Sequence, residues 1–134
     1  MNQAALLEKF RRESLATASP AKLLTMLYDR LLLDLDRATA AIEAGDRAAA
    51  NEQLSHAQQI VHELRCNLDV EAWDGAAQLM GLYHYLYERL VKANVALDAD
   101  IVAECRALIE PLREAWHQAA AATPSDNGPA AAFG

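Results

Sequence analysis

The chain is short of residues that break helices and has no apolar run long enough to cross a membrane. Its 134 residues include five glycines and four prolines, and two of the prolines come after residue 122. The longest apolar stretch, residues 23–35, is interrupted by Asp29, Arg30 and Asp34, so we expect no membrane insertion. The N-terminus lacks a basic head followed by an apolar segment, which predicts a protein without a secretory signal that stays in the cytoplasm.

The residues that carry catalytic or metal chemistry are equally sparse. Cys66 and Cys105 are too few for a disulfide framework and lack the spacing of a metal or redox pair. One Glu-x-x-His motif is present, at Glu114 and His117, whereas a carboxylate-bridged metal pair in a helical bundle needs two. No phosphate-binding glycine loop or hydrolase nucleophile motif occurs. We therefore expect no metal, no cofactor and no enzymatic activity.

Positive charge is also limited. The chain has twelve Lys and Arg residues and nineteen Asp and Glu residues, which gives a formal net charge of -7. Such a chain is repelled by phosphate backbones and by anionic lipid head groups, so nucleic acids and membrane surfaces are not expected partners.

The residues that are abundant point to one fold class. The chain has 29 alanines and 20 leucines but only nine isoleucines and valines together. Alanine and leucine favour helices, and β-branched residues favour strands, so the composition predicts an all-α protein. With 53% apolar residues, the chain has enough material for a core.

Four segments carry a seven-residue apolar repeat, and breaks at 45–46, 69–75 and 97–100 separate them. Helices of similar length joined by short loops predict an antiparallel up-down four-helix bundle over residues 17–122. Residues 1–16 are expected to form an N-terminal flap, and residues 123–134 a disordered tail. Pro111 falls within the fourth segment, where we favour one bent helix over two. The repeats are Leu24, Tyr28, Leu31, Leu35, Ala38 and Ile42; Ala50, Leu54, Ala57, Val61, Leu64 and Leu68; Leu79, Tyr83, Leu86, Leu90, Ala93 and Leu97; and Val102, Cys105, Ile109, Leu112, Trp116 and Ala119.

The third segment has more apolar residues than one core stripe needs. Met80, Tyr83, Tyr87 and Val91 are three and four residues apart and form a second ridge, and Ile60 on the second segment lies off the core register. Methionine and tyrosine are favoured at adaptable contact surfaces. The spacing is compatible with a groove for a partner helix, with homodimerisation, or with burial in the core.

One short motif suggests a different class of function. His62-Glu63-Leu64-Arg65 is similar to the His-x-Leu-Lys core of histidine phosphotransfer domains, which are also four-helix bundles. Cys66 replaces the small glycine that normally follows, so the ordinary interpretation is a solvent-facing helix residue. We keep a phosphotransfer domain with His62 as phosphoacceptor, and a generic dimerisation bundle, as alternatives.

Several collinear blocks resemble the FliS family, the flagellin-specific export chaperones. The first is the Thr-Ala-Ser-Pro and Met-Leu-Tyr-Asp signature within residues 15–29. Further blocks follow in the same order at residues 57–69, 82–94 and 112–116, so that the likeness covers roughly residues 10–118.

The resemblance implies a cytoplasmic chaperone that binds the C-terminal segment of newly made flagellin, prevents premature polymerisation and keeps the subunit competent for type III export. It implies no cofactor, and the flagellar export gate becomes a second candidate partner. Ordering a disordered segment is entropically costly, so a large contact area is expected. The chaperone itself is expected to be a monomer or a weak homodimer.

The predicted sites combine this resemblance with the spacing of apolar residues. The partner-binding residues are expected to be Ile60, Leu64, Met80, Tyr83, Tyr87 and Val91. The flap that covers the groove before the partner displaces it is expected to use Leu6, Leu7 and Phe10.

Overall fold

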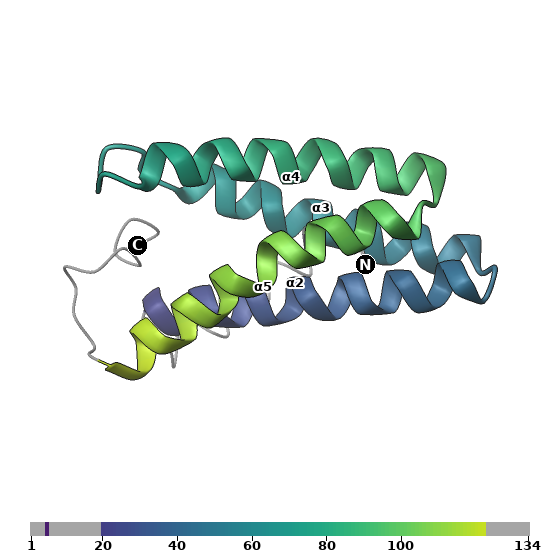
Figure 1. The fold of residues 1–134 in the computed structure, drawn as a ribbon, viewed down its shortest axis with the longest axis horizontal. Coiled ribbons are helices and arrows are strands. Elements are labelled where there is room, and N and C mark those ends of the chain that lie inside the picture. Colours follow the sequence, from purple (N-terminus) through teal and green to yellow (C-terminus); the bar gives the residue numbers. More distant parts are fainter. Residues whose placement is uncertain (1–4, 6–19, 123–134) are drawn as a thin grey trace.

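In the computed structural model, which describes Ala5 and residues 20–122, the chain forms the predicted antiparallel four-helix bundle (Figure 1). The helices follow one another around the bundle, and each packs against the next, with α5 closing the ring onto α2. No strand occurs in the described residues. The elements are α2 (Pro20–Glu43), α3 (Arg47–Asn67), α4 (Ala76–Ala96) and α5 (Ala99–Ala122).

The ends of the helices follow from local sequence. Pro20 is the first residue of α2, a position where the missing N–H group costs nothing. Gly45, with φ of +73°, turns the chain after α2, and the Asp46 side chain caps α3 by accepting from the Ala49 N–H at 3.0 Å. Leu97 ends α4 in the left-handed conformation, with φ of 51°. The three predicted breaks are thus the three turns of the bundle.

The helical register predicts most of the core. The buried apolar side chains include nearly all of the four heptad series, from Leu24 in α2 to Trp116 in α5. The prediction is wrong at Ala119, which is exposed, and Ile42, Leu97 and Leu112 are only half-buried. Ala119 and Leu112 share a cause, because both lie on the last turns of α5, where that helix diverges from α4 (Figure 1).

Pro111 does not divide the fourth helix. α5 continues as one α-helix from Ala99 to Ala122, as favoured from the sequence, although proline offers no N–H to the carbonyl of Ala107. Pro111 itself is exposed, so its ring meets solvent rather than a neighbouring helix.

Two predicted regions fall outside the part of the chain that the structure describes. The flap residues Leu6, Leu7 and Phe10 lie there, as does the whole of residues 123–134. The proposed division at residues 17 and 122 therefore stays a prediction, whereas the helices themselves are placed. Within the described residues, none of the helices is apolar over enough of its length to span a membrane.

A hydrogen-bonded Asp–His pair is buried between α2 and α3. Asp34 is fully buried, and one of its carboxylate oxygens pairs with Nδ1 of the buried His56. The other oxygen accepts from Arg30 Nε at 3.0 Å. A carboxylate removed from water is costly unless it is paired, so Asp34 and His56 fix the position of α3 against α2.

We predict that His56→Ala lowers the free energy of unfolding by about 3 kcal/mol, because it leaves a buried carboxylate with only Arg30 as partner. Urea unfolding followed by circular dichroism measures this change. Arg106→Ala, which removes the solvent-exposed ion pairs with Asp36 and Glu110, is the control and should cost no more than about 1 kcal/mol. An equal loss of unfolding free energy in the two variants would show that the buried pair stabilises the fold no more than an exposed ion pair does.

Candidate partner-binding site

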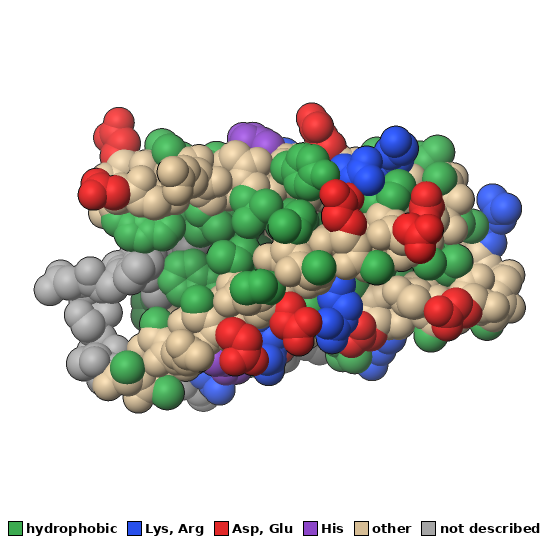
Figure 2. Space-filling view, viewed as in Figure 1, with side chains coloured by type: hydrophobic (Ala, Val, Ile, Leu, Met, Phe, Trp, Pro, Cys, Tyr) green, Lys and Arg blue, Asp and Glu red, His purple; other side chains and the backbone are tan. Residues whose placement is uncertain are grey.

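The described residues form an apolar groove between the first half of α4 and the C-terminal half of α5. Its volume is about 450 Å³. Figure 2 shows this hollow as a green area where the two helices separate. The lining side chains are bulky and apolar on the walls and small elsewhere: Trp73, Gly75, Gln78, Leu79, Leu82, Leu112, Ala115, Trp116 and Ala119. We name this feature the α4/α5 groove.

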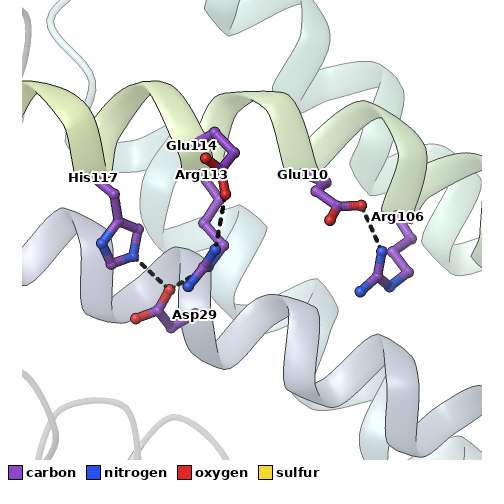
Figure 3. A network of polar contacts seen from close by, with 6 residues as sticks. All are labelled: Asp29, Arg106, Glu110, Arg113, Glu114 and His117. Atoms are coloured by element: carbon purple, nitrogen blue, oxygen red, sulfur yellow. Dashed lines mark hydrogen bonds and ion pairs between the residues drawn. The ribbon is translucent and has the colours of Figure 1, made fainter.

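One wall of the groove is held in place by an ionic contact with α2. Asp29 lies on α2, and its Oδ1 accepts from Arg113 Nε at 2.6 Å and lies 2.7 Å from His117 Nε2 (Figure 3). Both partners are on the last turns of α5. Burial alone would raise the pKa of Asp29, but the hydrogen bonds from His117 and Arg113 outweigh it and lower that pKa. The ionised carboxylate therefore draws the C-terminal half of α5 toward α2.

A second contact joins α5 to α4 at the other end. Glu104, near the start of α5, accepts from the Tyr85 hydroxyl at 2.6 Å and from Arg89 Nε at 2.7 Å. Both hydrogen bonds lower the pKa of Glu104. α5 thus contacts α4 through Glu104 near its start and α2 through Asp29 further along, and α4 and α5 diverge toward the C-terminal end of α5 (Figure 1). The α4/α5 groove is the space that this divergence leaves.

Buried aromatic side chains support the groove from behind. The Tyr28 and Tyr83 hydroxyls hydrogen-bond to each other at 2.6 Å. The ring of Trp116 packs against that of Tyr28, with the two ring centroids 6.3 Å apart. Burial raises the pKa of Tyr28 to about 12 and raises the pKa of Tyr83 as well. Both phenols are therefore neutral, and Trp116 is held as a rigid part of the groove wall.

The structure separates the predicted partner-binding residues into two groups. Ile60, Leu64 and Tyr83 are buried in the core, so the predicted second ridge is interrupted at Tyr83. Met80 and Tyr87 are half-buried, and Val91 is exposed. None of the six lines the α4/α5 groove.

The partly exposed residues belong to a different surface, between α3 and α4. The guanidinium of Arg65 lies over the ring of Tyr87 on α4, and its Cζ is 4.5 Å from the ring centroid. Arg65 Nη2 is also 3.0 Å from Nδ1 of His62, which is half-buried beside the exposed Cys66. We name Met80, Tyr87 and Val91 the α3/α4 strip. A cation covers part of its largest member, so the strip is less open than the groove.

Sequence reasoning missed the groove residues because it assigned several of them to the core or to a loop. Leu112, Trp116 and Ala119 form part of a regular heptad series, and nothing in that series shows where α5 leaves α4. Trp73 lies in a predicted break. A tryptophan in a short polar loop is the signal that was available, since such a large apolar side chain needs a surface to pack against.

The described residues bring no set of candidate metal ligands together. Within them, no group of three or more His, Cys, Asp or Glu side chains is placed to hold a metal ion. Glu114 and His117, the two residues of the Glu-x-x-His motif, make contacts with other side chains: Glu114 pairs with Arg113, and His117 pairs with Asp29 (Figure 3). The fold and the groove together define the class: a helical-bundle binding protein.

Comparison with known proteins identifies the family. Residues 2–123 match the FliS family, described as flagellar protein FliS. The chain is 36% identical over 110 residues to the flagellar secretion chaperone FliS of Bacillus subtilis, covering 82% of each chain. It is 38% identical over 104 residues to the FliS chaperone of Salmonella typhimurium, covering 76% of this chain and 77% of the relative. The Escherichia coli FliS chaperone is 36% identical over 104 residues, with 76% of each chain covered.

The chain belongs to the FliS family. It is a flagellar secretion chaperone and not an enzyme, as the family and these relatives imply. A substrate of the flagellar export system is accordingly its class of partner. The resemblance derived from residues 15–29 and the later blocks is confirmed.

We predict that the contribution of Asp29 to stability depends on pH. Its pKa is lowered in the folded state, so the contribution is present above the pKa of about 4 that an unfolded aspartate has and is lost as pH falls through the lower folded pKa. Melting temperatures of wild type and Asp29→Asn at pH 7, 4 and 2 measure this. The wild type should melt higher at pH 7, and the difference should disappear at pH 2. A constant difference across this range would contradict the assignment.

Proposed function

We propose that this chaperone binds the C-terminal segment of flagellin in the cytoplasm, prevents premature polymerisation of the subunit and keeps it competent for type III export. The single observation that supports this most strongly is the α4/α5 groove, an apolar hollow of about 450 Å³ that opens to the surface in a secretion chaperone. Monomeric proteins seldom leave such patches open unless a partner covers them.

The groove has the geometry of a receptor for a helix. It runs between two helices, and its small residues Gly75, Ala115 and Ala119 leave space for the side chains of an incoming segment. Grooves of this kind bind the apolar face of an amphipathic helix. The free C-terminal segment of a polymerising subunit has such a face, which is why it needs to be masked before export.

We include the α3/α4 strip in the proposed contact surface. Met80, Tyr87 and Val91 would contact the partner directly, and Ile60, Leu64 and Tyr83 would support them from the core. Leu6, Leu7 and Phe10 remain the proposed cover that flagellin displaces. We further propose that the export gate recognises the loaded chaperone, and that the chaperone itself acts as a monomer or a weak homodimer.

The test of the groove is a one-to-one complex with the last forty or so residues of the cognate flagellin. Both tryptophans of the chain, Trp73 and Trp116, line the groove, so intrinsic fluorescence reports its occupancy. We predict that Ala115→Phe, which places a bulky ring in the groove from an exposed position, weakens binding at least about tenfold.

The matched control is Ala107→Phe, an exposed alanine on the same helix outside the groove. It should bind like the wild type. Failure of the wild type to bind the segment at micromolar concentration would reject the proposed function, and equal binding by both variants would move the site away from the groove.

A separate prediction concerns the α3/α4 strip. Tyr87→Glu should weaken flagellin binding strongly while the helical circular dichroism signal stays unchanged, because Tyr87 is only half-buried. Val95→Glu, at an α4 residue that is 80% exposed, is the control and should change neither quantity. Unchanged affinity in Tyr87→Glu would remove the strip from the binding surface, and loss of helical signal would make Tyr87 a residue of the fold.

A further inference from the structure

Arg65 on α3 is held beside α4 by groups that carry no negative charge. Its guanidinium lies over the ring of Tyr87, with Cζ 4.5 Å from the ring centroid. Its Nη2 is 3.0 Å from Nδ1 of His62, and its Nη1 is 3.4 Å from Nδ1 of His84. A guanidinium can only donate hydrogen bonds, so both imidazole nitrogens accept and neither carries a proton. These contacts orient the guanidinium without neutralising its charge.

Arg65 differs in this respect from the other arginines that join two helices. Each of the others in the described residues donates to a carboxylate: Arg89 to Glu104, Arg106 to Asp36 and Arg113 to Asp29. No carboxylate within the part of the chain that the structure describes contacts Arg65. A half-buried guanidinium without an anion is unexpected in a chain that has nineteen Asp and Glu residues. Its planar set of donors matches the two oxygens of a carboxylate that comes from outside the chain.

We propose that Arg65 binds an acidic side chain of the segment that lies on the α3/α4 strip. The donors are Nε–H and those N–H groups of Nη1 and Nη2 that the two imidazoles do not use. The occupant is a helical segment with Asp or Glu beside an apolar ridge, because Tyr87 places apolar area directly under the cation and Met80 and Val91 extend it along α4. A free anion would leave that apolar area uncovered. The inference rests on the proposed function for the protein to which the segment belongs.

The experiment uses three synthetic helical peptides with the same leucine ridge and one flanking position that is glutamate, glutamine or lysine. Isothermal titration calorimetry measures their binding to the full chain. We expect the glutamate peptide to bind about tenfold more tightly than the glutamine peptide, because a charge-assisted hydrogen bond is stronger than a neutral one. The lysine peptide should bind most weakly, since like charges then meet at Arg65.

Two variants with the same change in net charge separate a local contact from general electrostatics. Arg65→Gln should abolish the preference for the glutamate peptide, whereas Arg37→Gln, at an exposed position of α2, should retain it. Arg65→Lys is the milder variant if Arg65→Gln alters the helical circular dichroism signal. It should keep part of the preference, because lysine retains the charge but not the planar pair of donors.

The four histidines of the chain provide a second measurement that locates the carboxylate. Binding of the glutamate peptide should shift the ring nitrogen NMR resonances of His62 and His84, which both contact Arg65. Those of His56 and His117 should not move, because these two rings pair with carboxylates on α2. The glutamine peptide should shift the first pair less.

The proposal is overturned if none of the peptides binds, if glutamate is not preferred, or if Arg65→Gln and Arg37→Gln change the preference equally. Inorganic phosphate that shifts His62 and His84 and displaces the glutamate peptide would make a free anion the ligand and reject the peptide. A flagellin segment that binds while the peptides show no preference rejects this inference alone. A preference for glutamate that depends on Arg65, without binding of the flagellin segment, rejects the proposed function alone.

Discussion

The carboxylate of Asp29 joins α2 to the C-terminal half of α5, the half that forms one wall of the candidate site. Its oxygen bonds to Arg113 and lies beside His117, two residues that are four apart and so share one face of α5. With the C-terminal half of α5 held against α2, that half cannot also close onto α4. Glu104 fixes the other half to α4 through Tyr85 and Arg89. The groove lies beside the half of α5 that turns from α4 toward α2, and Arg106, which donates to Asp36 at 2.7 Å, adds a further contact between α5 and α2.

This arrangement gives a physical meaning to the Met-Leu-Tyr-Asp run at residues 26–29. Leu27 and Tyr28 are buried, and Asp29 lies at the helix interface. Tyr28 supports Trp116 from behind while Asp29 anchors the same turns of α5 from the side. Tyr28 and Asp29, which are consecutive on α2, thus both contact the part of α5 that forms the groove wall, although neither residue lines the groove. A motif of this kind identifies the scaffold of a binding site and not its contact surface.

The helices and the core were predictable from the sequence, because each depends on local periodicity. The turn at Gly45 and the cap at Asp46 follow from residue type alone. The location of the groove was not predictable, since it depends on the angle between α4 and α5. The same register that buries Val102 and Ile109 leaves Ala119 exposed once the helices separate. Apolar surplus on α4 predicted a ridge of partner-binding residues, but within that ridge Tyr83 is buried and Arg65 covers part of Tyr87.

An export chaperone has to release its cargo, and the groove is suited to that requirement. A hollow of about 450 Å³ accommodates only a few side chains, so it cannot by itself offset the entropy lost when a long segment becomes ordered. Useful affinity then has to come from several modest contacts along the segment, and the proposed function places one of them in the groove and another at the α3/α4 strip. Contacts that are individually weak can be lost one after another, so release does not require the whole interface to break at once. Most of the heptad core and the buried Asp34–His56 pair lie away from this surface, although Leu79 and Trp116 belong both to the core and to the groove wall. The chain can therefore keep an apolar groove open to solvent and remain folded both with its partner and without it.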